Sequence, residues 1–85
     1  MTSRFDVLVE VSLRDGVADP QGSTIERSLP ALDVAGVTGV RVGKAIRFTM
    51  EATDEADARA RVKDLCRRFL SNPVIEDSRV EVRPQ

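Results

Sequence analysis

The stretch FDVLVEVSL, residues 5–13, decides the fold, because apolar side chains recur along it at every second position. The residues that would share one face are Phe5, Val7, Val9, Val11 and Leu13. Strict alternation over this length predicts a β-strand with one buried face. Leu8 interrupts the polar side, so we do not expect the outer face to be wholly solvated.

A loop over residues 14–18 and then a helix are expected after this strand. Asp19 suits the N-cap, because its carboxylate can accept amide protons of the first turn, and Pro20 suits the first helical position. A competing start exists at Ser23, with Glu26 placed as in a capping box. We favour the start at Asp19, which leaves Ser23 inside the helix.

The same helix should end irregularly. Pro30 lies late in it and would kink or loosen the last turn, since proline cannot donate the helical hydrogen bond. Gly36 is the expected stop.

Two further strands are predicted over residues 37–42 and 45–52. Gly43 and Lys44 lie between them and would form a tight hairpin turn.

A second helix should begin at Thr53 or Asp54 and end before Asn72-Pro73, because the residue before proline avoids helical geometry. Its apolar stripe has helical spacing and consists of Ala58, Val62, Leu65 and Phe69. A last strand would hold Val80 and Val82 inward.

The predicted order is therefore β-α-β-β-α-β in a single domain, residues 1–85, without an internal linker. This order predicts an α+β fold: a ferredoxin-like two-layer sandwich whose antiparallel sheet carries two helices on one face.

Composition excludes several classes of function. The 85 residues carry 13 basic and 14 acidic side chains, a net charge of −1, which argues against a nucleic-acid binder. We find no signal peptide and no membrane span, and expect a cytoplasmic protein without a membrane partner. The one cysteine fits a reducing compartment.

Catalytic groups are scarce in the chain. It has no histidine, and Cys66 has no evident activating base, so we interpret Cys66 as a packed helix residue. All three phenylalanines fit core positions, which leaves no aromatic surface for stacking RNA bases. Lys44 could bind an anion, although a solvated turn lysine is the simpler interpretation. A small-molecule-sensing regulatory domain stays open as an alternative function.

Three motifs point to a known family. Asp19-Pro20-Gln21-Gly22, Val40-Arg41 with Gly43-Lys44, and Asn72-Pro73-Val74-Ile75-Glu76-Asp77 stand in the order and spacing of the PurS family. Nearly the whole chain resembles this family, the small subunits of phosphoribosylformylglycinamidine synthase. Ser78 departs from the pattern, because many members carry an aromatic residue there.

The resemblance implies a noncatalytic subunit of a ligase complex in de novo purine biosynthesis. A glutaminase subunit releases ammonia from glutamine, and a large synthetase subunit uses ATP to activate the amide oxygen of formylglycinamide ribonucleotide. Ammonia then displaces the phosphate. The small subunit bridges these partners and assists ammonia transfer. No cofactor is expected on this chain; ATP and Mg²⁺ would bind to the synthetase partner.

We further predict that the motif residues contribute to subunit contacts. Gly22 would allow a close backbone approach, and the exposed apolar Val74 and Ile75, followed by Glu76 and Asp77, suit an interface. A homodimer or higher homo-oligomer is also expected, because a domain this small gains stability from a partner. The outer sheet face, which mixes acidic and basic residues, is one candidate surface.

Overall fold

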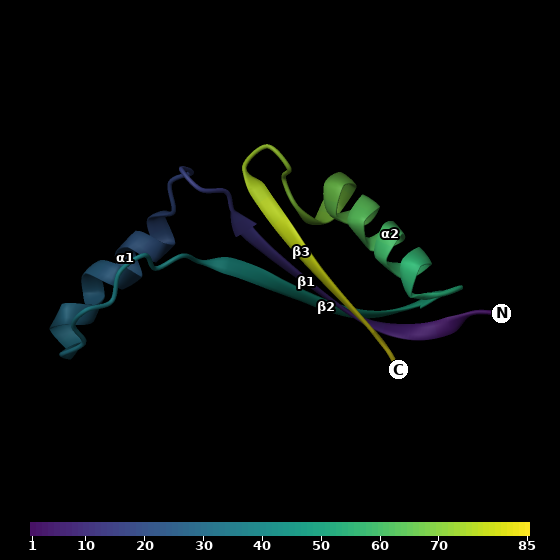
Figure 1. The fold of residues 1–85 in the computed structure, drawn as a ribbon. Helices are drawn as coiled ribbons and strands as arrows, with labels where there is room; N and C mark the ends of the chain where they lie inside the picture. The colour runs from purple at the N-terminus through teal and green to yellow at the C-terminus, as the bar shows by residue number, and fades with distance from the viewer.

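The computed structural model describes residues 1–85, and its strands form one antiparallel sheet of three strands. β1 (Ser3–Leu13) is central, and β2 (Gly43–Ala52) and β3 (Glu76–Pro84) flank it (Figure 1). The predicted first strand is thus confirmed. Its alternate side chains are buried as expected: Phe5, Val7, Val9 and Val11.

Helix α2 (Glu55–Leu65) covers the inner face of this sheet (Figure 1). It begins at Asp54, whose carboxylate accepts a hydrogen bond from the Asp57 amide at 2.7 Å. Val62 of the helix and Val9 of β1 are 1% and 0% exposed, so the core lies between α2 and the central strand. Burial of such side chains is the main source of stability in a small domain.

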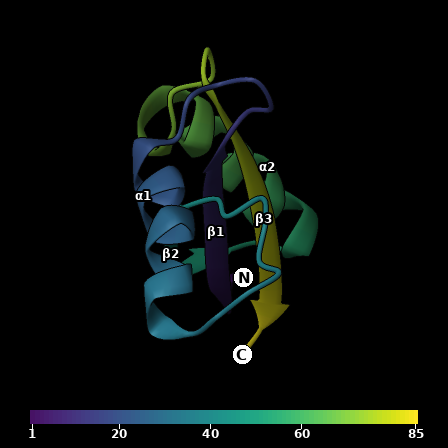
Figure 2. The ribbon, with the colours of Figure 1, turned by 90° about the vertical axis from the view of Figure 1, so that its left-hand side faces the viewer.

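Helix α1 (Pro20–Ser28) takes a different position. It lies beyond the end of the sheet, at the opposite end of the molecule from α2 (Figure 1). Figure 2 shows the molecule from this end, with α1 facing the viewer. The radius of gyration is therefore 16.7 Å, against about 12 Å for a compact domain of this length. The antiparallel α+β architecture of ferredoxin-like type is confirmed, but only α2 packs on the sheet within this chain.

The hairpin predicted at Gly43-Lys44 is wrong. These two residues are extended and begin β2, where they pair with Ser12 and Val11 of β1. The strand predicted over residues 37–42 is absent, which leaves β2 as an edge of the sheet.

Side-chain hydrogen bonds explain the missing strand. The amides of Val40 and Val42 donate to carboxylates of Glu26 and Asp19 rather than to a neighbouring strand. Gly39 also has a φ of 72°, which breaks an extended run. Tertiary contacts have overridden the strand propensity of the valines.

The ends of both helices are irregular. Pro30 loosens α1 as predicted, because a 3₁₀ turn, Leu29–Leu32, follows Ser28. The left-handed residue after this turn is Asp33, with a φ of 61°, and not the predicted Gly36.

The end of α2 also corrects a prediction. The helix widens into a π turn, Cys66–Leu70. Cys66 is buried, as expected, but Phe69 is 80% exposed and does not belong to the core. Leu70 packs against the core in its place.

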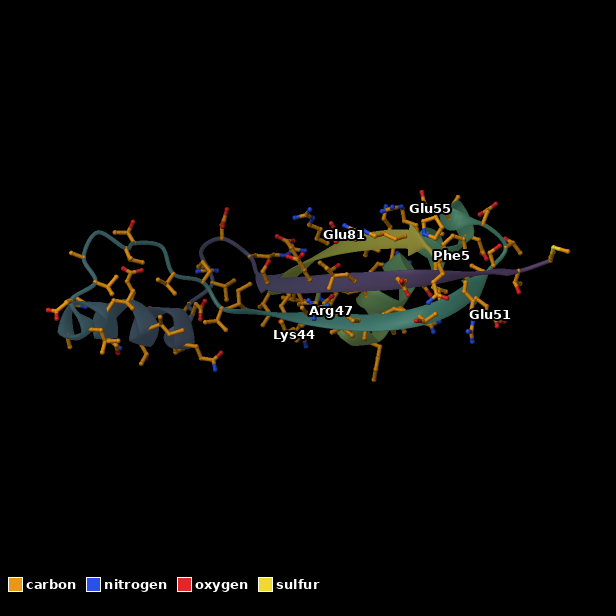
Figure 3. All side chains as sticks on the ribbon, turned by 90° about the horizontal axis from the view of Figure 1, so that it is seen from below. Phe5, Lys44, Arg47, Glu51, Glu55 and Glu81 are labelled. Carbon is orange, nitrogen blue, oxygen red and sulfur yellow. The ribbon has the colours of Figure 1, made fainter.

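The outer face of the sheet carries mixed charge. Figure 3 shows Arg47 near the α1 end of β2 and Glu51 near its other end. Leu8 is half-buried on this face, between Arg47 and Glu81 in the strand register. No helix of the structure combines the length and the apolar character needed to cross a membrane.

Candidate functional site

Asp19 organises the first motif. Its Oδ1 accepts a hydrogen bond from the Gly22 amide at 2.9 Å, which confirms it as the N-cap of α1. Its Oδ2 accepts a second bond from the Val42 amide at 2.8 Å. These two bonds, with the nearby Arg41 guanidinium, hold the pKa of Asp19 below its ordinary value. One carboxylate thus starts the helix and ties it to the segment before β2.

Gly22 is buried against the same segment. A Cβ at this position would overlap the carbonyl oxygen of Val40, so only glycine allows the approach. The backbone that approaches Gly22 therefore belongs to this chain. This contact explains the glycine without a partner subunit.

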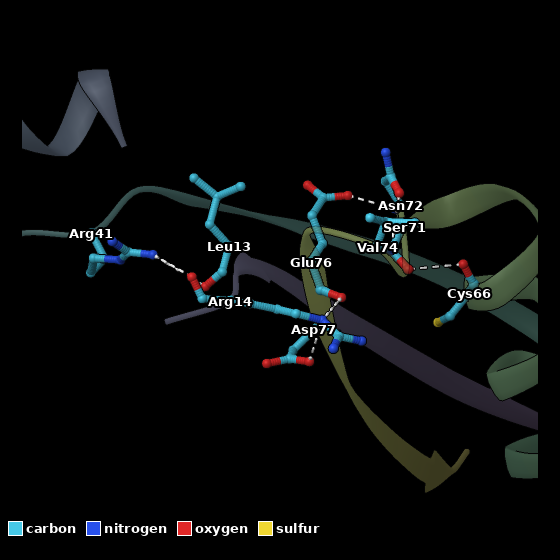
Figure 4. A network of polar contacts seen from close by, with 9 residues as sticks. All are labelled: Leu13, Arg14, Arg41, Cys66, Ser71, Asn72, Val74, Glu76 and Asp77. Carbon is cyan, nitrogen blue, oxygen red and sulfur yellow. Dashed lines mark hydrogen bonds and ion pairs between the residues drawn. The ribbon is translucent and has the colours of Figure 1, made fainter. Parts of the chain in front are cut away.

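Arg41 clamps the loop between β1 and α1. Its guanidinium donates hydrogen bonds to three carbonyl oxygens, those of Leu13, Arg14 and Val17, at 3.1–3.3 Å. Figure 4 shows Arg41 directed at the end of β1. Arginine suits this work because its planar fork carries five donors.

The motif at residues 72–77 forms a closed turn. The carbonyl oxygen of Asn72 accepts bonds from the Ile75 and Glu76 amides, and its side-chain oxygen accepts one from Val74. In return, the Asn72 amide donates to Glu76 Oε1 at 2.6 Å (Figure 4). The turn satisfies its own backbone, which leaves its apolar side chains available: Val74 is 79% exposed.

Arg14 connects this turn to the end of β1. Its amide donates to the Ile75 carbonyl at 2.8 Å, and its Nε lies 3.4 Å from an Asp77 carboxylate oxygen (Figure 4). Because Arg41 binds the Arg14 carbonyl, the contacts run from the third motif through Arg14 to the second. Arg14 was not among the predicted site residues, and no local sequence pattern marks it.

The three motifs therefore meet at one end of the sheet, where β1 ends and β2 and β3 begin. A hollow of about 320 Å³ opens there. Residues of all three motifs line it: Asp19, Pro20, Gln21, Gly43, Lys44 and Glu76. Asn72, Pro73, Val74, Ile75 and Asp77 lie outside it, in the adjoining turn and strand.

The motif residues divide into two groups. Asp19, Gly22 and Arg41 make contacts inside the chain. The other group is exposed at the surface: Pro20, Gln21, Lys44, Pro73, Val74 and Ile75. The side chains of this second group are free to meet another molecule.

Comparison with known proteins finds similarity along nearly the whole chain. The family model described as "PurS: Phosphoribosylformylglycinamidine (FGAM) synthase" matches residues 6–84. The chain is 42% identical to the PurS subunit of phosphoribosylformylglycinamidine synthase from Bacillus subtilis, over 92% of each chain.

Solved structures agree with the sequence comparison. The crystal structure of the PurS subunit from Thermotoga maritima superposes with a TM-score of 0.87 at 35% identity, covering 96% of this chain and 94% of the other. A chain in the structure of PurLQS from Thermotoga maritima superposes with a TM-score of 0.85 at 37% identity, covering 93% and 96%. Because these matches span nearly the whole length of both compared chains, this chain belongs to the PurS family of phosphoribosylformylglycinamidine synthase.

Proposed function

We propose that this chain is the noncatalytic small subunit that bridges the glutaminase and the ATP-dependent synthetase of phosphoribosylformylglycinamidine synthase in the cytoplasm. The observation that carries the proposal is its similarity, over 93% of its length, to a chain in the PurLQS structure. The glutaminase would supply ammonia, the synthetase would bind ATP and Mg²⁺, and this chain would hold the two together while ammonia passes between them.

The surface of the chain suits such a role. Gln21 and Lys44 are exposed at the hollow where the motifs meet, and the side chain of Lys44 forms neither an ion pair nor a hydrogen bond within the chain. Val74 and Ile75 add apolar surface in the adjoining turn. Apolar side chains beside unpaired polar groups are typical of protein–protein interfaces.

Reconstitution tests the proposal. The synthetase and glutaminase from the same source are assayed with and without this chain, supplied either with glutamine or with free ammonia. We expect glutamine-driven turnover to require this chain and ammonia-driven turnover to persist without it. If neither rate changes, the proposed function is wrong, and binding of a free amino acid or nucleotide to the isolated chain would favour a regulatory domain instead.

Self-association is part of the same proposal. A groove of about 410 Å³ lies between β2 and α2, and its apolar floor includes Phe48, Met50 and Leu65. At the other end of the molecule, α1 exposes Ile25, which is 45% accessible. In a twofold dimer each copy could place its α1 on the groove of the other, so that both apolar surfaces become buried.

A charge on α1 tests this arrangement. Ile25→Glu should convert an oligomer into monomers, and Ser23→Glu, a neighbouring exposed position, should not. Sedimentation velocity measures the state of both variants. If Ile25→Glu keeps the mass of the unmodified protein, α1 does not form the self-interface.

A further inference from the structure

Phe69 is exposed because it lies in the π turn that ends α2. Buried residues recur at every fourth position along the helix, at Ala58, Val62 and Cys66. Through the wider turn the same spacing continues to Leu70, which packs against the core. Phe69 stays outside this series and is 80% exposed.

The π turn is held by specific contacts. The Ser71 amide and the Ser71 hydroxyl both donate to the Cys66 carbonyl, at 3.0 and 2.9 Å (Figure 4). π turns inside α-helices are rare and frequent at functional sites. An ordered backbone that presents a large aromatic side chain to solvent is typical of an interface anchor, because aromatic residues are enriched among interface hot spots.

The charges beside Phe69 select the kind of partner. Arg67 and Arg68 both pair with the single carboxylate of Asp64, at 2.9 and 3.5 Å. Two guanidinium groups share one anion, so a positive charge remains on the two residues that precede Phe69 in the sequence. A complementary surface would offer an apolar pocket bordered by carboxylates.

A second copy of this chain fits that description poorly. Its apolar groove beside α2 is bordered by Arg61 and Arg68, with Asp64 as the one acidic residue. Since Asp64 is already paired with Arg67 and Arg68, docking Phe69 there would bring like charges together. The charge pattern therefore favours a different protein.

We infer that Phe69, flanked by Arg67 and Arg68, anchors this chain in an apolar pocket bordered by carboxylates on one of the larger subunits of the synthase. The inference rests on the proposed function and names a contact for it. Val74 lies five residues after Phe69 in the sequence, in the turn that follows the π turn. It is a second exposed apolar side chain, 79% accessible.

Direct binding tests the inference. The full chain carries a fluorescent label at its N-terminus, and its anisotropy is measured during titration with the mixed synthetase and glutaminase subunits. Phe69→Ser should weaken binding at least about tenfold, as expected for an aromatic hot spot. Phe69→Leu should recover most of the affinity, because it keeps an apolar side chain.

Charge variants test the flanking arginines. Arg67→Glu should weaken binding and reduce its dependence on salt, whereas Arg47→Glu, on the outer sheet face, should leave both unchanged. Sedimentation velocity of each variant alone checks self-association.

The possible results distinguish a failure of the proposed function from a failure of the inference about Phe69. If the unmodified chain binds neither larger subunit, the proposed function and this inference both fail. Should it bind while Phe69→Ser binds equally well, the inference alone is overturned. A Phe69→Ser variant that instead loses self-association would assign Phe69 to a contact between copies, which also overturns it.

Discussion

The two ends of this molecule are stabilised in different ways. At one end, α2 and the sheet bury a continuous apolar core that includes Phe5, Val9 and Val62. At the other end, α1 contacts its own chain mainly through polar groups: Asp19 and Glu26 accept hydrogen bonds from backbone amides. The sheet end therefore has a core of its own, whereas the α1 end depends on a few directional bonds and leaves apolar surface uncovered.

The largest loss of stability should come from a substitution in the core between α2 and the sheet. Val9→Asp places a carboxylate at a position that is 0% exposed, without a partner for its charge. Burying an uncompensated charge costs several kcal/mol, comparable to the whole stability of a small domain. We expect loss of the sheet signal in far-ultraviolet circular dichroism and of the cooperative thermal transition.

Leu8→Asp is the matched control for this change. Leu8 is the next residue along β1, but it points to the opposite, mixed-charge face and is only half-buried. This variant should remain folded. Equal damage from both substitutions would mean that the outer face is as important to the fold as the inner one.

The sheet end is also the part that the sequence predicts well. The period of two in residues 5–13 and the helical spacing of Ala58 and Val62 reflect burial against a core that each element needs. Such patterns are local. They can be recognised without knowing which element lies opposite.

The α1 end is harder to predict from the sequence, for a physical reason. Val40 and Val42 alternate as in a strand, but their amides bond to carboxylates 14 and 23 residues earlier in the chain. No spacing rule connects such distant residues. The family resemblance selects the motif residues as a group, but sequence alone cannot separate Gly22, which serves the chain's own packing, from exposed Gln21.

An intermediate effect should come from Gly22→Ala. Helix propensity alone would favour alanine over glycine by about 1 kcal/mol. The new Cβ, however, would overlap the Val40 carbonyl oxygen, and such overpacking typically costs ~1–3 kcal/mol. We therefore expect α1 to separate from the segment before β2 while the core end stays intact.

Amide hydrogen exchange distinguishes the two ends in this variant. Protection should fall at Val40 and Val42 and stay unchanged at Val9. Ser23→Ala, at the exposed neighbouring position, gains helix propensity without the overlap and should preserve protection throughout. If the Val42 amide is as well protected from exchange in Gly22→Ala as in the unmodified chain, the close approach to the Val40 carbonyl is not the reason for glycine at this position.

The smallest effect should appear as a dependence on pH confined to the α1 end. Hydrogen bonds from the Gly22 and Val42 amides keep the pKa of Asp19 below its ordinary value in the folded chain. For a group with a lowered folded pKa, the stabilisation is present above the unfolded value, about 3.9, and is lost as pH falls through the folded value. The contact between Asp19 and Val42 should therefore survive at pH 5 and weaken only below about pH 4.

The chemical shift of the Val42 amide proton, followed by NMR from pH 6 to pH 2, reports this contact directly. Asp19→Asn is the control, because it removes the titrating carboxylate at this position. The side-chain oxygen of asparagine can still accept the Gly22 hydrogen bond and cap α1, but its amide nitrogen would face the Val42 amide, which is also a donor. The variant should show a displaced Val42 signal already at pH 6 and no further change attributable to residue 19. A Val42 titration with a midpoint at or above the ordinary pKa of aspartate would show that these bonds do not favour the ionised carboxylate.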